Sequence, residues 1–172
     1  MTPAAAIPVL TTDRLTLRAP RRSDAGAVCG FFASDRSAII GGPSDEAGAW
    51  RRFGSLAGGW VICGFGWWLI ADRETDTPLG MAGIHHPTYK PQRELGWFLT
   101  GDAEGKGLAT EAAAAARDWA FANLNAEPLV SYIGDDNPRS QAVARRLGAR
   151  LDGPSIWDGV SIWRHERQGG AA

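Results

Sequence analysis

Alternating and clustered apolar residues predict most of the strands of this chain. Leu15 and Leu17 alternate with polar neighbours, which is the period of a half-buried strand. Apolar runs that end at turn residues predict four further strands, over 66–71, 78–85, 93–100 and 129–133. The polar segment 72–77 predicts a hairpin turn between the first two of these, and a closing hairpin is predicted over 156–164, with its turn at 158–159.

Two helices are predicted in the first third of the chain, before the second strand. Ser23 and Asp24 have the residue types of a helix N-cap and acidic first turn, and positions 28, 31 and 32 supply an apolar stripe. The segment 44–46 predicts the start of a second helix that carries Trp50 and Phe53 on one face.

The clearest helical period lies over 108–123, directly after a glycine-rich turn. Five apolar residues recur there at spacings of three and four: Leu108, Ala112, Ala115, Trp119 and Ala122. A short last helix is bracketed by Asn137 as N-cap, Pro138 as first residue and Gly148 just past its end. Its inward residues are predicted to be Ser140, Val143 and Leu147. Together the elements predict a mixed α/β (α+β) sandwich whose strands are largely antiparallel.

Length and composition indicate one globular domain. The 172 residues are 44% apolar and 22% charged, which argues against an intrinsically disordered chain. We expect a single domain over 8–168, with flexible tails at 1–7 and 169–172. With 18 basic and 19 acidic residues the formal charge is −1, which disfavours binding to nucleic acid.

The cysteine pattern and the N-terminus favour a cytoplasmic protein without a metal site. Cys29 and Cys63 have no CxxC spacing and no histidine cluster beside them, so we expect reduced thiols. No secretory signal is visible. The uncharged segment 53–71 contains five glycines and charged residues flank it, so a membrane span is disfavoured.

The glycine turn before the long helix predicts an anion site. The first N–H groups of a helix lack backbone partners, and glycines let phosphate oxygens come close to the backbone. Gly101 and Gly105 enclose three residues where a Walker loop needs four, and Thr110 stands where a dinucleotide fingerprint needs its third glycine. Another phosphate ligand, or a tight connection without any ligand, remains.

The turn and its flanking segments resemble one family along nearly the whole chain. Gly105-Lys106-Gly107-Leu108-Ala109-Thr110-Glu111-Ala112 resembles the coenzyme motif of the GNAT superfamily of acetyl-CoA-dependent N-acetyltransferases. Further segments resemble its ribosomal-protein-alanine (Rim-type) branch, in family order: Thr12–Arg18, Leu79–His86, Glu94–Trp97, Asn137–Ser140, Leu147–Ala149 and Trp163–His165.

The resemblance implies a fold, a co-substrate and its contacts. The fold is a GNAT-type mixed, largely antiparallel central sheet flanked by helices and splayed between the fourth and fifth strands. The co-substrate is acetyl-CoA, and no metal is implied. The coenzyme contacts carried over by the motifs are Phe98, Leu99, Gly105, Lys106, Gly107, Leu108, Ala109, Thr110 and Asn137. Asn137 is equally well explained as a plain helix cap.

Two positions depart from the family pattern. Glu104 stands where arginine or glutamine usually begins the phosphate motif, so we expect its carboxylate to point to solvent, with Lys106 partly compensating. Ala144 stands where many members carry the tyrosine that protonates the leaving thiolate. Tyr89 and Tyr132 lie on other elements, so we expect a water or the Ser140 hydroxyl to supply that proton.

The acceptor side is assigned to residues on the strands. Glu94 is predicted as general base acting through water, with His86 as the second choice. Trp67 and Trp97 are predicted to bind the acceptor, although most tryptophans belong to a core. A surface ion pair explains Glu94 nearly as well, and inert surface histidines or a packing serine explain His86 and Ser140.

The resulting hypothesis is a cytoplasmic N-acetyltransferase, as monomer or homodimer, that acetylates a protein N-terminus or a small amine. It predicts no nucleic-acid or membrane partner. Two alternatives stay open: a non-catalytic acyl-CoA-binding or sensing domain, and an aminoglycoside-type antibiotic acetyltransferase. An acidic cleft formed by Asp35, Asp45, Glu46 and Glu94 would favour the latter.

Overall fold

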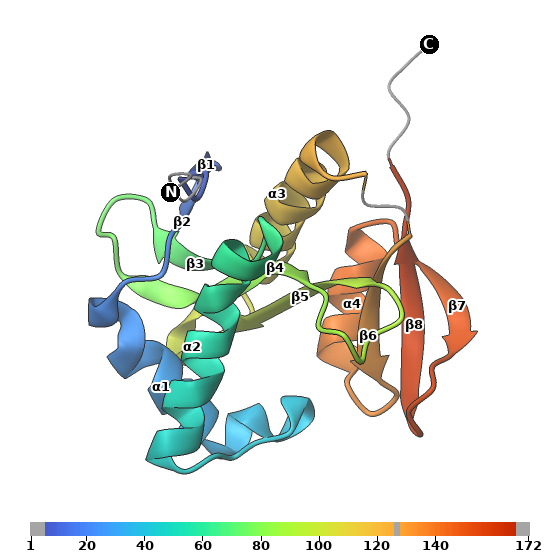
Figure 1. Ribbon diagram of the computed structural model, residues 1–172, viewed down its shortest axis with the longest axis horizontal. Coiled ribbons are helices and arrows are strands. Elements are labelled where there is room, and N and C mark those ends of the chain that lie inside the picture. Colours follow the sequence, from blue (N-terminus) through green and yellow to red (C-terminus); the bar gives the residue numbers. More distant parts are fainter. Residues whose placement is uncertain (1–5, 126–127, 168–172) are drawn as a thin grey trace.

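The structure is a computed structural model that describes residues 6–125 and 128–167 (Figure 1). The strands are β1 (Leu10–Thr11), β2 (Leu15–Arg18), β3 (Trp67–Asp72), β4 (Pro78–His85), β5 (Arg93–Leu99), β6 (Leu129–Gly134), β7 (Arg150–Pro154) and β8 (Val160–His165). The helices are α1 (Ala25–Ala33), α2 (Glu46–Cys63), α3 (Leu108–Asn123) and α4 (Pro138–Arg146). Short 3₁₀ segments are η1 (Arg22–Asp24), η2 (Asp35–Ile40) and η3 (Gly101–Ala103).

All eight strands form one sheet in the order β1-β2-β3-β4-β5-β6-β8-β7. Every pairing is antiparallel except β5 with β6. These two strands pair only through Arg93 with Leu129 and Glu94 with Val130, and they diverge beyond that point. The mixed, largely antiparallel sheet that the sequence predicted is confirmed, and the splay between the predicted fourth and fifth strands lies between β5 and β6.

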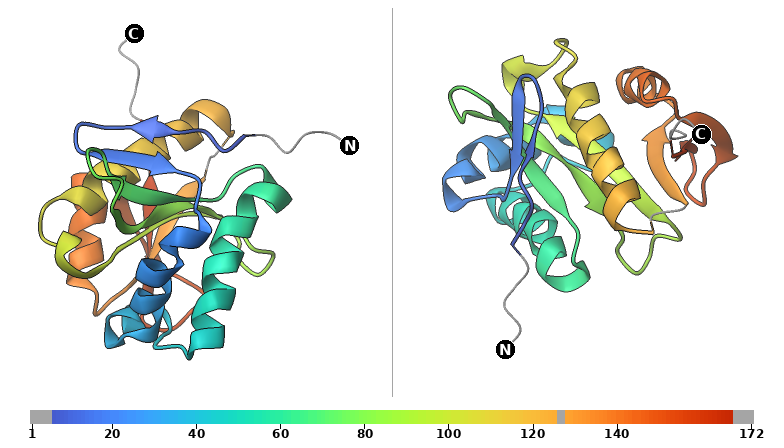
Figure 2. Two further views of the ribbon diagram at one scale, coloured as in Figure 1. Left: turned by 90° about the vertical axis from the view of Figure 1, so that its left-hand side faces the viewer. Right: turned by 90° about the horizontal axis from the view of Figure 1, so that it is seen from above.

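Helices cover both faces of the sheet. α1 and α2 lie on one face, where they bury one apolar core against β3, β4 and β5 (Figure 2). α3 lies on the other face and buries a second core with the opposite side chains of the same strands. α4 packs beside β6 and β8, where Ala144, Ile133 and Trp163 form a third, smaller core. The sheet therefore places α3 and α4 on either side of the splay.

The start of α1 differs from the prediction. Asp24 is fully buried and accepts two hydrogen bonds from the Arg18 guanidinium at 2.9 Å each, and its side chain does not cap α1. Ser23 lies inside η1. Ser23 is therefore not the N-cap of α1, which is Asp24, and the Asp24 side chain forms a buried ion pair with Arg18 of β2 instead of a capping bond, because a buried charge needs such a partner.

Two helical faces also differ. Phe53 of α2 is buried as expected, whereas Trp50 is 49% exposed and forms a T-shaped contact with the Phe53 ring. In α3 the buried residues extend past the predicted stripe to Ala113, Ala116, Ala120 and Phe121, and Ala122 is exposed. α3 touches β2, β4, β5 and α4, so its buried face is wider than a stripe that faces a single neighbour.

The closing hairpin begins earlier than predicted. β7 spans Arg150–Pro154, and Ile156 lies in the loop with 70% of its surface exposed. The Ser155 N–H donates to the Val160 carbonyl at 2.8 Å, and its hydroxyl accepts from the Trp157 N–H at 3.0 Å. Ser155 therefore closes the loop of the hairpin, one residue before the point where the first strand of that hairpin was predicted to begin.

The uncharged segment 53–71 is divided between the end of α2 and most of β3. Among the described residues, no helix is both long and apolar enough to span a bilayer. Cys29 and Cys63 are free thiols, as expected. Residues 1–5 and 169–172 of the predicted tails lie outside the described residues.

Candidate active site

A groove of about 1380 Å³ opens beside the splay. Its walls come from the end of β5, the turn before α3, the first turns of α3 and α4, and the 3₁₀ segment η2. The residues that line the groove include Trp97, Leu99, Gly105, Thr110, Asn137 and Ser140. The structure thus brings most of the predicted coenzyme contacts to one groove.

The glycine turn has a backbone that only glycine adopts easily. Gly105 and Gly107 have φ angles of +77° and +79°, and Gly107 is the N-cap of α3. The first intrahelical acceptor is the Gly107 carbonyl, which the Glu111 N–H reaches at 3.1 Å. The N–H groups of Leu108, Ala109 and Thr110 precede it, so they are free of helical partners.

A buried hydroxyl marks the same place. Thr110 Oγ1 has no hydrogen-bond partner among the described residues, although Thr110 lines the groove. An unpaired buried hydroxyl is costly, and a phosphate oxygen that binds in the groove would satisfy it. The turn, the helix N-terminus and this hydroxyl therefore fit a diphosphate such as that of coenzyme A.

Residues far away in the sequence hold the turn in place. Glu111 accepts from the Thr12 hydroxyl at 2.6 Å and from Arg14 Nε at 2.7 Å, and Arg14 also donates to the Lys106 carbonyl at 2.9 Å. Burial by itself raises the pKa of Glu111, but the hydrogen bonds from Thr12 and Arg14 outweigh it and the pKa is lowered. Glu111 thus stays ionised and ties the turn to the β1–β2 connection. The tether was not predicted from the sequence, because a lone glutamate in a first helical turn gives no specific signal for it.

Glu104 does not simply point to solvent. Its carboxylate pairs with Arg36 from η2 and with Arg139 from α4, the latter at 2.9 Å. All three residues line the groove. The negative charge that the sequence places beside a phosphate site is therefore neutralised by two arginines from opposite walls, which corrects the expectation of an exposed carboxylate.

The backbone of β5 presents two residues to the splay. The Thr100 N–H donates to the Leu79 carbonyl at 2.8 Å, toward β4. In an antiparallel strand, the backbone N–H and C=O groups of every second residue point to the same neighbouring strand. Those of Phe98 therefore also point to β4, whereas those of Trp97 and Leu99 point to the splay. Phe98 and Leu99 were both predicted to contact the coenzyme through the backbone. Of the two, Leu99 has an N–H that faces the splay, whereas Phe98 lines the groove with its side chain.

The two predicted acceptor tryptophans lie on opposite faces of the sheet. The Trp67 indole is buried over Gly96, with Phe98 at 6.0 Å between ring centroids, on the face that α1 and α2 cover. Trp97 packs on the other face and lines the groove. The structure therefore does not bring them into one acceptor site.

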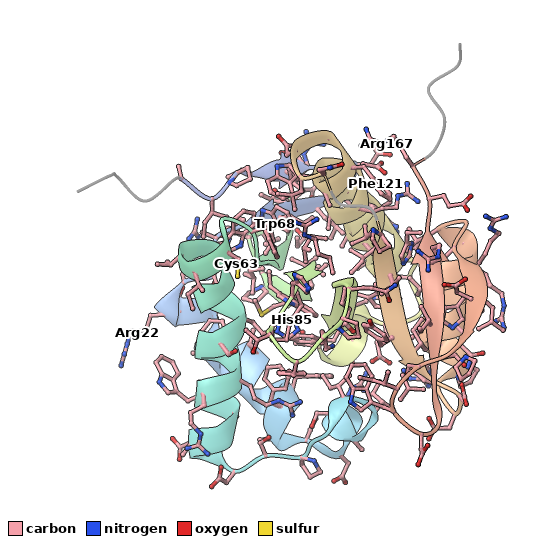
Figure 3. All side chains as sticks on the ribbon, turned by 45° about the vertical axis from the view of Figure 1, so that its right-hand side comes forward. Arg22, Cys63, Trp68, His85, Phe121 and Arg167 are labelled. Carbon is pink, nitrogen blue, oxygen red and sulfur yellow. The ribbon has the colours of Figure 1, made fainter. Side chains whose placement is uncertain are left out.

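Glu94 lies on the same face as Trp67 and Phe98. Its carboxylate forms an ion pair with Lys90 and lies 3.8 Å from His85 Nδ1, and only 13% of its side chain is exposed. His85 is half-buried next to the Trp67 indole and is labelled near the centre of the view in Figure 3, whereas His86 is exposed. The histidine beside Glu94 is thus His85 and not His86, the residue predicted as the second choice for the general base.

Asn137 and Ser140 form the N-terminus of α4. Asn137 Oδ1 accepts from the Ser140 N–H at 3.1 Å, which is the predicted cap, and its Nδ2 donates to the Ser140 hydroxyl at 3.1 Å. Val143 and Leu147 are buried as expected, and Ser140 lines the groove. Ala144 is fully buried against Ile133 and Trp163, so a tyrosine at that position would not fit.

A serine and a histidine close the narrow end of the splay. The Ser131 hydroxyl donates to the Leu95 carbonyl at 2.6 Å, so it accepts from His165 Nε2 at 2.9 Å. Burial, with a further contribution from Arg117, lowers the pKa of His165 to about 4. The histidine is therefore neutral at physiological pH.

We expect the free energy of unfolding to fall as the pH drops below about 6.5, the pKa of an unfolded histidine. Below that pH the histidine of the unfolded chain binds a proton, whereas buried His165 stays neutral until about pH 4. The free energy of unfolding therefore falls by about 2 kcal/mol between pH 6.5 and 5. Urea unfolding of wild type and His165→Gln across this range measures the effect. His86→Gln, at an exposed histidine, is the control, and equal pH slopes in wild type and His165→Gln would contradict the assignment.

Residues 14–150 match the profile of the acetyltransferase (GNAT) domain family. An acetyltransferase from Agrobacterium tumefaciens is 41% identical, with a TM-score of 0.89 over 94% of this chain and 96% of that one. Ribosomal-protein-S5-alanine acetyltransferase from Vibrio fischeri (18% identity, TM-score 0.70, 92% and 95% covered) and RimL, a ribosomal L7/L12 α-N-protein acetyltransferase in complex with coenzyme A (17%, 0.73, 92% and 97%), share the fold. The chain therefore belongs to the GNAT acetyltransferase family and is an acyltransferase.

Proposed function

We propose that this acyltransferase moves the acetyl group of acetyl-CoA to a primary amine, which is a protein or peptide N-terminus or a small amine. The observation that carries the proposal is the groove with the unpaired Thr110 hydroxyl beside the Gly105–Gly107 turn. The likeness to Rim-type structures supports a protein N-terminus as acceptor. The proposed location is the cytoplasm.

The proposed roles combine the placement of the groove residues with the sequence-based assignment of Glu94, which is not among the residues that line the groove. The N–H groups that begin α3 and the Thr110 hydroxyl bind the diphosphate, and the Leu99 N–H polarises the thioester carbonyl. Glu94 accepts the proton of the acceptor amine, through a water, as the nitrogen attacks. Ser140, or a water beside it, returns a proton to the leaving thiolate.

Acetyl-CoA is expected to raise the melting temperature of the wild-type protein. At a hundredfold excess over Kd the ligand adds about 2.7 kcal/mol to the free energy of unfolding. Gly107→Glu is expected to abolish the rise, because it places a carboxylate and a strained left-handed residue where the diphosphate binds. Gly30→Glu, at an exposed helical glycine with open space around it, makes the same charge change elsewhere.

The melting experiment is paired with a thiol-release assay over peptides, small amines and aminoglycosides, with Cys29 and Cys63 controlled for. Absence of a thermal shift in wild type, or an equal shift in folded Gly107→Glu, would contradict the coenzyme site. Binding without turnover across the panel would identify a sensing domain instead.

A further inference from the structure

Lys90 is enclosed in a way that is unusual for a lysine. Its ammonium pairs with the Glu94 carboxylate and lies 5.3 Å from the centre of the Tyr132 ring and 5.9 Å from that of Trp157. Only 15% of its side chain is exposed. Lysines keep their ammonium in water unless specific partners replace it.

The partners that replace water here are those that recognise amines. Tyr132 and Trp157 meet edge to face, with centroids 5.0 Å apart, so their rings line two sides of one small site. A cation within about 6 Å of an aromatic face is attracted by the ring, and more strongly where water is excluded. A carboxylate and two aromatic rings around one ammonium form a binding site for a cation, and we call Glu94, Tyr132 and Trp157 the ammonium cage.

Without Lys90, the ammonium cage would carry one negative charge, that of Glu94, which a single ammonium ion would balance. Burial, then the charge of Glu94, raises the pKa of Tyr132, so its phenol stays neutral and donates to Gln92 Oε1 at 3.1 Å. Glu94 is then the negative group and the Lys90 ammonium is the charge that pairs with it, while His85 Nδ1 lies 3.8 Å from the carboxylate. A vacated cage therefore lacks one positive charge.

Lys90 can leave without disturbing the sheet. It lies in the connection between β4 and β5, in a turn closed by its own N–H on the Pro87 carbonyl at 2.9 Å. Glu94, by contrast, is paired within β5, and Tyr132 within β6, where the two strands begin to diverge. The cage is thus fixed by strands and its occupant is carried by a loop.

We propose that Glu94, Tyr132 and Trp157 bind the ammonium group of the acceptor, and that Lys90 is a built-in occupant that the acceptor displaces. This inference rests on the proposed function and assigns the site that holds the ammonium group of its acceptor. The resting protein then binds acceptors more weakly than its cage allows, because each must compete with Lys90.

The probe is n-butylammonium, which has the same heavy atoms as the lysine side chain beyond Cα. Calorimetric titration is expected to show Lys90→Ala binding it at least tenfold more tightly than wild type. 1-Butanol, without the charge, is expected not to bind. Lys90→Met keeps the cage filled and is expected to gain little, and Arg22→Ala removes an exposed cation that points away from the body (Figure 3).

The cage itself is tested in the Lys90→Ala background. Trp157→Leu or Tyr132→Leu is expected to lose the gained affinity, whereas Tyr132→Phe, which keeps the ring, is expected to retain most of it. Circular dichroism and the acetyl-CoA thermal shift report whether each variant is folded. Equal affinity of wild type and folded Lys90→Ala for n-butylammonium, or equal binding of 1-butanol, would overturn the proposal.

Activity measurements separate this inference from the function it rests on. With n-butylamine as acceptor, Lys90→Ala is expected to lower the acceptor KM at least tenfold and to leave the KM for acetyl-CoA unchanged. Turnover with an unchanged acceptor KM would reject the occupied cage alone. Tight binding of n-butylammonium without turnover of acetyl-CoA by any variant would reject the transferase function and leave the cage standing.

Discussion

Replacement of Glu94 by glutamine is expected to lower kcat/KM for the acceptor by about 10²- to 10³-fold. Glutamine has nearly the same shape but cannot accept the proton of the attacking amine. A peptide α-amine, with a pKa near 8, is about one-tenth neutral at pH 7, whereas a lysine-like amine is only about 0.04% neutral. The loss is therefore expected to be larger for lysine-like acceptors and to grow as the pH falls.

The measurement is the pH–rate profile of Glu94→Gln beside those of His86→Ala and His85→Ala. His86 is exposed and His85 lies 3.8 Å from Glu94. The two histidine variants therefore show whether either histidine acts as the base. The double variant Glu94→Gln/Lys90→Ala removes the ammonium that Glu94→Gln leaves unpaired. An unchanged kcat/KM in Glu94→Gln near neutral pH removes Glu94 from the mechanism, and a collapse confined to one histidine variant transfers the role to that residue.

Gly83→Ala is expected to leave little folded protein. A Cβ at Gly83 would lie 2.3 Å from the Gly66 carbonyl oxygen and 2.4 Å from the Trp67 Cα, both backbone atoms that no rotamer change can move. Overpacking that shifts backbone costs about 3 kcal/mol or more, a large part of the roughly 5–15 kcal/mol that stabilises a domain. β3 and β4 carry the core beneath the predicted acceptor side, so activity is expected to be lost as well.

Urea unfolding followed by circular dichroism measures the effect. Gly30→Ala is the matched control, because its Cβ would meet nothing within 4 Å in α1 and alanine favours a helix over glycine by up to about 1 kcal/mol. A Gly83→Ala midpoint equal to that of wild type would show that β3 and β4 lie further apart than this register places them.

Sequence periodicity predicted the elements because local forces determine them. Leu15 and Leu17 alternate as a strand should, and Asn137, Pro138 and Gly148 bracket α4 through local capping and turn chemistry. The glycine turn before α3 was predicted for the same reason. In each case the physical cause lies within a few residues of the pattern.

The side-chain partners were not predictable, because they join residues far apart in the chain. Asp24 was expected in the capped first turn of a helix, but its side chain pairs with Arg18. Glu104 was expected to point to solvent, but it pairs with one arginine from η2 and one from α4. The ammonium cage joins Glu94 with Tyr132 and Trp157 from beyond α3. No periodicity connects such positions, and each of them reads as an ordinary surface residue by itself.

The two outer strands of the sheet have a consequence for aggregation. β1 contains two residues, and β7 carries a register irregularity between Leu151 and Gly153 and ends at Pro154, which has no N–H to offer another strand. Charged Arg150 and Asp152 alternate along β7. Short, irregular, charged or proline-blocked edges do not template the pairing of strands from other chains. This eight-stranded sheet is therefore protected at both ends against growth into fibrils, even though an open sheet always has two free edges.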